Sequence, residues 1–166
     1  MLAGKQAQFE KLIRAYSPEL YRYAYWLCRD RFQAEDLLQE TFARAWKARD
    51  DLRDEAAARS WLYTILRNER ARLFERKRFD YDENQELDEI PDPATDIARD
   101  CEVRDAVRAL PLGYREPLLL QWIGGYSCAE IGTIMNLTVG AVMTRLTRAR
   151  IALGRAERSV KKGVAR

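Results

Sequence analysis

The stretch from Ser127 to Leu153 constrains the fold of this chain more than any other part of its sequence. Ser127 is followed three residues later by Glu130, which is the pattern of a helix-capping box, and apolar residues then recur at helical spacing. Asn136 suits the left-handed conformation that ends a helix, and Thr138 can cap a second one. The apolar stripe of that second helix comprises Val142, Leu146, Ala149 and Leu153. The sequence therefore predicts two helices joined by a tight turn.

The opposite face of the second predicted helix is small, basic and free of acidic residues. The side chains that point away from its apolar stripe or flank that face are Gly140, Thr144, Arg145, Thr147, Arg148 and Arg150. Such a face is typical of the second helix of a helix-turn-helix, because short side chains allow close approach to the major groove and arginines reach base edges and phosphates. We therefore expect it to bind duplex DNA. The alternative is a plain helical hairpin with a solvated basic face.

Two helical domains are predicted for the chain of 166 residues. Helical periodicity is nearly continuous and strand patterns are absent, so the expected fold class is all-α. Residues 80–98 contain eight acidic residues, two prolines and no basic residue. This composition predicts an acidic flexible linker between domains at residues 1–79 and 99–166, and the acids could also shield both domains from DNA in the free protein. An ordinary solvated loop is the alternative.

Composition narrows the function classes further. The chain has no histidine, and Cys28, Cys101 and Cys128 lack the CxxC spacing, so neither a His-dependent triad nor a zinc site is expected. We expect no cofactor, no metal and no enzymatic activity. An odd number of thiols suits the reducing cytoplasm, and neither a signal peptide nor a run of 18 apolar residues is found. The sequence thus predicts a cytoplasmic protein that does not insert into a membrane.

A compact acidic face is predicted on a helix over residues 33–48. At helical spacing, this face gathers Asp36, Gln39, Glu40 and Ala43. Acids in a first helical turn also favour the helix dipole, which would explain Asp36 without any partner. The helix dipole explains Gln39 and Glu40 less well, because they lie beyond the first turn. Because phosphate would repel this face, we expect it to bind a protein partner that carries basic residues.

A second informative helix is predicted over residues 58–78. We expect its outer face to carry Tyr63, Arg67, Arg70 and Phe74, and one edge to carry Trp61, Asn68 and Arg72. Aromatic rings interleaved with arginines suit a single nucleic-acid strand, because bases stack on rings, at about 1–3 kcal/mol each, and phosphates pair with cations. The alternative is the edge of a core with arginines that extend their head groups to water.

Three segments, in fixed order around the acidic stretch, resemble one family. They read AEDLLQETFARAWK (34–47), RSWLYTILRNERARLFERKR (59–78) and LPLGYREPLLLQWIGGYSCAEIGTIMNLTVGAVMTRLTRAR (110–150). Together they resemble the extracytoplasmic-function (ECF) sigma factors of bacterial RNA polymerase, from about residue 9 to 155. The resemblance implies a first domain that binds core polymerase and melts the −10 promoter element, and a second that reads the −35 element. It also implies an anti-sigma factor as a partner.

The resemblance also implies roles for individual positions. Asp36, Gln39 and Glu40 would face the clamp helices of the largest polymerase subunit, and Thr144, Arg145 and Arg148 would meet the −35 duplex. Trp61, Asn68 and the loop 50–60 would handle the separated −10 strand. Together with the rings and arginines of the predicted helix over 58–78, the candidates for the −10 element are Trp61, Tyr63, Arg67, Asn68, Arg70 and Arg72. The sequence departs from the family at Met143, where Lys or Arg is usual, and at Ala141, where Thr is usual. Loss of that cation puts one phosphate contact in doubt.

Two rival functions remain at this point. A free-standing helix-turn-helix regulator would explain the C-terminal region, but it would need a dimer interface and a ligand pocket. A helical enzyme acting on nucleic acid would need a catalytic site, and the sequence offers no evident cluster for one.

Overall fold

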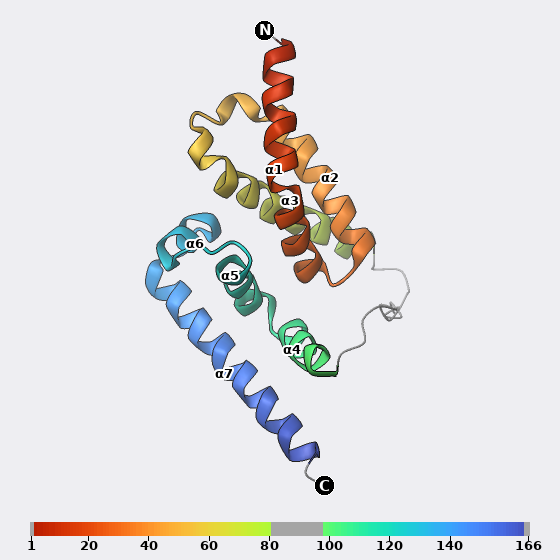
Figure 1. Ribbon diagram of the computed structural model, residues 1–166, viewed down its shortest axis with the longest axis vertical. Coiled ribbons are helices and arrows are strands. Elements are labelled where there is room, and N and C mark those ends of the chain that lie inside the picture. Colours follow the sequence, from red (N-terminus) through yellow and green to blue (C-terminus); the bar gives the residue numbers. More distant parts are fainter. Residues whose placement is uncertain (1, 81–97, 165–166) are drawn as a thin grey trace.

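The computed structural model describes the backbone of residues 2–80 and 98–164, and the side chains of residues 3–76 and 103–155. Within these ranges the chain forms helices and no strand, arranged as two small helical domains (Figure 1), so the predicted fold class is confirmed. Most of the predicted acidic linker, including residues 81–97, lies outside the described residues. No helix in the described part of the chain is both long enough and apolar enough to span a bilayer.

The N-terminal domain consists of α1 (Leu2–Cys28), α2 (Arg31–Lys47) and α3 (Ala58–Asp80). Two short 3-10 turns, Arg49–Asp51 and Glu55–Ala57, connect α2 to α3. The sharp turn between α1 and α2 uses Arg29 at φ 61° and Asp30, whose side chain accepts a hydrogen bond of 2.9 Å from the Gln33 backbone N–H. The largest core side chains of this domain are Leu20, Tyr23, Leu27, Leu37, Leu62, Tyr63 and Leu66.

The C-terminal domain consists of α4 (Ala98–Ala109), α5 (Leu112–Trp122), α6 (Cys128–Met135) and α7 (Val139–Val164). The predicted capping box is present at the start of α6, and Asn136 ends α6 in the left-handed region at φ 54°. Thr138 Oγ1 accepts a hydrogen bond of 3.1 Å from the Ala141 backbone N–H. A Cβ at Gly132 would lie 2.7 Å from the Leu137 carbonyl oxygen, so the tight turn needs glycine there. The helix-turn-helix geometry is as predicted.

The two domains pack directly against each other. Helix α1 lies against α5, and α3 lies against α6 (Figure 1). The ring of Tyr63 on α3 meets the ring of Tyr126, which precedes α6, edge-on at a centroid distance of 5.4 Å. Buried apolar residues of both domains therefore form one continuous core, in which Leu66 and Leu118, for example, both take part. Nothing in the sequence pattern predicted this contact.

Candidate functional site

The acidic face predicted on the helix over residues 33–48 is exposed on α2. Asp36, Gln39, Glu40 and Ala43 all point to solvent, while the opposite side of α2 is buried through Leu37, Thr41 and Ala45. Thr41 keeps its hydroxyl satisfied in the core by donating to the Leu37 carbonyl oxygen at 2.7 Å. Asp36 and Glu40 form no ion pair with any described residue. Their carboxylates are thus available to a basic partner surface.

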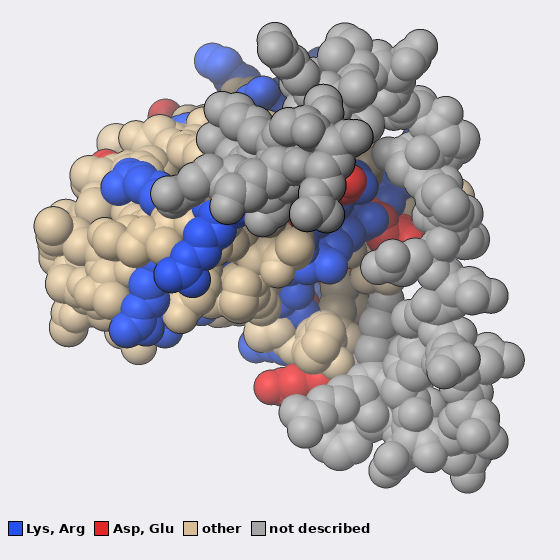
Figure 2. Space-filling model, turned by 90° about the horizontal axis from the view of Figure 1, so that it is seen from below, with Lys and Arg blue, Asp and Glu red and all other residues tan. Residues whose placement is uncertain are grey.

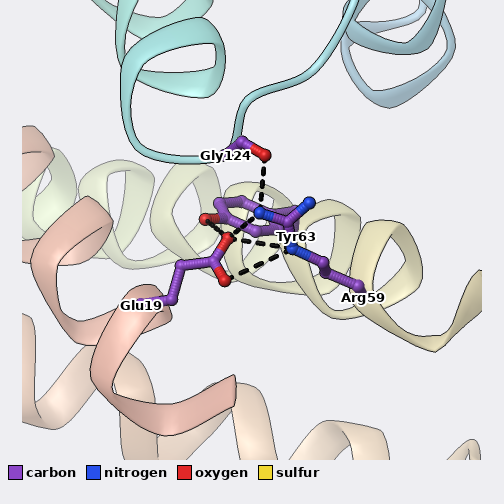
Figure 3. Close-up of polar contacts among 4 residues, drawn as sticks. All are labelled: Glu19, Arg59, Tyr63 and Gly124. Atoms are coloured by element: carbon purple, nitrogen blue, oxygen red, sulfur yellow. Dashed lines mark hydrogen bonds and ion pairs between the residues drawn. The ribbon is translucent and has the colours of Figure 1, made fainter. Parts of the chain in front are cut away.

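The prediction that Tyr63 lies on an outer face of α3 is wrong. Its side chain is fully buried, and its ring packs between Tyr23, at a centroid distance of 5.0 Å, and Tyr126. Its hydroxyl donates to Glu19 Oε1 at 2.6 Å (Figure 3). Burial first, and then the bond to Glu19, raise the pKa of Tyr63 well above its usual value. Helical spacing correctly divides α3 into two sides. It does not reveal that the C-terminal domain covers the side that carries Tyr63.

Arg59 joins three elements at the same contact. It lies at the start of α3, donates through Nε to Glu19 Oε1 of α1 at 3.0 Å, and donates through Nη2 to the Gly124 carbonyl oxygen in the turn after α5 (Figure 3). Its guanidinium also lies 4.7 Å from the centroid of the Tyr126 ring. We call Glu19, Arg59, Tyr63 and Gly124 the Arg59 latch. It fixes the start of α3 to the C-terminal domain.

Two more predicted −10 residues face the C-terminal domain instead of solvent. Arg67 Nε lies 2.9 Å from Glu116 Oε1 of α5, and this carboxylate is almost fully buried. Arg70 is half-buried, lies 5.7 Å from the Phe74 ring centroid, and borders a pocket that Arg115 of α5 also lines. In this arrangement of the domains, neither side chain presents its cation freely to a nucleic-acid strand.

The remaining −10 candidates lie at accessible positions. Asn68 is exposed, and Arg72 is half-exposed while it pairs with Glu69 Oε1 at 3.2 Å. Trp61 is partly buried and borders a hollow between the start of α3 and α6. The loop 50–60 is mostly exposed beside this hollow. The structure thus brings Trp61 and the loop together, and it places Asn68 further along α3.

The face predicted for duplex DNA lies along α7. The exposed residues of this face are Gly140, Thr144, Thr147, Arg148 and Arg150, whereas Arg145 is half-buried. Each arginine of this set contacts α5 or the residues beside it: Arg145 donates to the Gly113 carbonyl oxygen at 3.4 Å, Arg148 to the Tyr114 hydroxyl at 3.5 Å, and Arg150 to Gln121 Oε1 at 2.9 Å. These contacts tie all three arginines to α5. Met143 is exposed at the flank.

Sequence reasoning missed the residues that join the domains. Glu19, Glu116 and Tyr126 carry no local motif, and their partners lie forty or more residues away in the chain. The available signal was Glu116 directly before the apolar run from Pro117 to Leu120, because a carboxylate buried in such a helix requires a cation.

Comparisons with known proteins match both domains. Residues 12–79 match the family model "Sigma-70 region 2", and residues 102–153 match "Sigma-70, region 4". The ECF RNA polymerase sigma factor SigL of Mycobacterium tuberculosis is 31% identical over 151 residues, which cover 87% of this chain and 85% of SigL. SigW of Bacillus subtilis, another ECF RNA polymerase sigma factor, is 28% identical, with 90% and 89% covered.

Solved structures similar to this chain include a sigma factor. The sigma factor RpoE in complex with the anti-sigma factor NepR from Bartonella quintana superposes with a TM-score of 0.74 at 26% identity, over 91% of this chain and 97% of RpoE. CnrH in complex with the cytosolic domain of CnrY gives a TM-score of 0.69 at 26% identity, over 95% and 92% of the two chains. With both sigma regions in order and a relative above 30% identity across most of its length, the chain belongs to the extracytoplasmic-function sigma factors of bacterial RNA polymerase.

Proposed function

We propose that this sigma factor uses the exposed acidic face of α2 to bind core RNA polymerase. Asp36, Gln39, Glu40 and Ala43 contact the clamp helices of the largest subunit. The observation that carries this proposal is that two carboxylates and an amide share one solvent-facing side of α2 while the other side is buried. A surface of this kind attracts a basic protein partner and repels DNA.

The α7 face reads the −35 element. Thr144, Thr147 and Arg148 enter the major groove, with Gly140 allowing close approach, and Arg145 and Arg150 contact phosphates at its flanks. The contacts of these arginines with α5 support this role, because a cation held in place loses little conformational freedom on binding.

The −10 element is captured as a single strand by Trp61, Asn68, Arg72 and the loop 50–60. Arg67 and Arg70 join them when the C-terminal domain moves away, because both now face α5 or its pocket. Linking two weak DNA-binding domains on one polymerase then gives tight binding at a fixed promoter spacing. We place the domain boundaries at residues 1–79 and 99–166, with the linker at 80–98.

An anti-sigma factor is the expected negative regulator. RpoE and CnrH were both solved in complex with another protein, NepR and CnrY respectively. Similarity to these two chains over nearly their whole length supports a partner of this class here. We also propose a cytoplasmic location, where core polymerase and promoter DNA are found.

Reconstituted transcription tests the proposal. The chain and core polymerase are incubated with a pool of genomic promoters, and run-off products that depend on the chain are expected. Asp36→Arg with Glu40→Arg abolishes these products and the capture of core polymerase, with a stability change within about 0.5 kcal/mol because both sites are exposed. The matched control reverses two other exposed acids, Glu10 and Asp105, and retains both activities.

Two results would contradict this function. Unchanged polymerase capture by the α2 double variant would remove the clamp-helix assignment. Dimerisation of the free chain, together with promoter binding that needs no polymerase, would favour a free-standing helix-turn-helix regulator instead.

A further inference from the structure

A pocket of about 290 Å³ lies where the two domains meet, and three arginines line it. Arg29 follows α1, Arg70 lies on α3 and Arg115 lies on α5, so the cations come from both domains. Leucines and Phe74 supply the apolar part of the wall, and Asp36 is the acidic side chain among the described lining residues. Figure 2 views the molecule from below, and cationic side chains predominate over acidic ones among its coloured residues.

Arg115 is the most constrained of the three arginines. Only 4% of the residue is exposed, and its Nη1 donates to the Arg108 carbonyl oxygen at 2.9 Å. Its Nε is buried without a hydrogen-bond partner among the described residues. Burial first, and then the charges of Arg29 and Arg70, lower the pKa of Arg115 to about 10. A buried donor on a cation without a partner is costly, so this site favours a bound acceptor.

The described carboxylates do not neutralise this cluster. Glu116 is adjacent in sequence to Arg115, but its carboxylate pairs with Arg67. Within residues 3–76 and 103–155, Arg29, Arg70 and Arg115 form no ion pair with an acidic side chain. Three arginines and one acidic residue, Asp36, thus line the pocket. Guanidinium groups match the geometry of oxyanions, with two parallel N–H donors for two oxygens.

We propose that this pocket binds a small phosphate-bearing anion through Arg29, Arg70 and Arg115. A phosphate group carries more charge than a single carboxylate near neutral pH, and it offers several oxygens to donors that approach from different elements. Because the arginines belong to both domains, the bound anion holds the domains together. The anion is either inorganic phosphate or the phosphate group of a small organic metabolite. Arg70 is also a proposed −10 residue, and it lines this pocket while the two domains are packed together.

Phosphate titration of the full chain tests the proposal. Inorganic phosphate and glycerol 3-phosphate are added separately at constant ionic strength, while NMR follows the Nε–H resonance of Arg115 and a thermal melt follows stability. We expect a saturable shift of that resonance and a rise in melting temperature, because a ligand that binds only the folded state stabilises it. Tighter binding of glycerol 3-phosphate than of inorganic phosphate would identify an organic ligand, and the reverse order would identify the free ion.

Matched variants distinguish binding of phosphate in the pocket from non-specific screening of the protein's charges by added salt. Arg29→Gln and Arg70→Gln each raise the half-saturating phosphate concentration about tenfold, as expected for loss of one charge-assisted hydrogen bond. Arg14→Gln removes the same charge from an exposed site on α1, about 20 Å from Arg29 along the helix, and leaves half-saturation unchanged. The proposal is overturned if the Arg115 resonance shifts without saturation or if chloride produces the same shift. It is also overturned if Arg14→Gln weakens phosphate binding as much as the pocket variants do, or if citrate binds as tightly as phosphate.

Discussion

Replacing Arg59 by alanine should shift the equilibrium between packed and separated domains towards the separated state, without unfolding either domain. The change removes the hydrogen bond to the Gly124 carbonyl oxygen and the contact with the Tyr126 ring, both of which join the domains. A hydrogen bond from a charged donor contributes about 1.5–3 kcal/mol, and a cation–π contact at an exposed site contributes about 0.5–1 kcal/mol. Since about a third of the Arg59 side chain is exposed, at 32%, we take the lower part of the sum, about 2–3 kcal/mol.

That loss converts into a measurable change in the population of separated domains. At 1.4 kcal/mol for each factor of ten, the ratio of packed to separated molecules falls by about 30-fold to about 150-fold. Small-angle X-ray scattering should then show a larger radius of gyration for Arg59→Ala, and the amides of α5 and α6 should exchange faster with deuterium.

The control variant is Arg44→Ala. Arg44 pairs with Glu69 at 3.0 Å within the N-terminal domain, so its loss removes an ion pair of similar kind without touching the domain contact. Its radius of gyration should equal that of the parent chain. If Arg59→Ala lowers stability but leaves the radius of gyration and the exchange of α5 and α6 unchanged, then the Arg59 latch does not hold the domains together.

Two further predictions concern the C-terminal domain. Arg148→Ala should cost about 1–3 kcal/mol of affinity on the cognate promoter and relax one base preference, whereas Met143→Lys should steepen the salt dependence by about one unit, as measured by promoter affinity against salt with polymerase present. Gly132→Ala should destabilise the domain by about 1–3 kcal/mol in chemical denaturation, because its Cβ would meet the Leu137 carbonyl oxygen, whereas Gly140→Ala has open space and should not destabilise it. An unchanged base preference in Arg148→Ala, a salt slope of Met143→Lys parallel to that of the parent, or equal stability of the two glycine variants would contradict these assignments.

Local signals in the sequence predicted the helix-turn-helix well. The Ser127 capping box, the left-handed Asn136 and the Thr138 cap each depend on residues within four positions, and all three are present. The apolar stripe of α7 is buried at Val142, Leu146 and Ala149, as its spacing predicted. The exposed acidic face of α2 also followed from helical spacing alone. These features are decided by geometry within one or two helical turns.

The domain contact could not be predicted in the same way. Periodicity divides α3 into sides, yet it does not say which neighbour covers each side, and Tyr63 was therefore assigned to an exposed face that is in fact buried. From the sequence alone, Arg67 is expected to be a surface cation. In the structure it pairs with Glu116, which lies 49 positions later in the chain. Pairings at such separations depend on how whole domains meet, and one sequence contains no direct record of that.

The continuous core has a consequence for how the free chain melts. Leu66 and Leu118 belong to one apolar cluster although they come from different domains, so loss of either domain's packing exposes side chains of the other. Heating the free protein should therefore give a single calorimetric peak whose van't Hoff enthalpy equals the measured enthalpy. Destabilisation introduced in α7 would then appear as a lower melting temperature of α1. The chain would behave as one cooperative unit when free, and as two independent units once its domains are held apart.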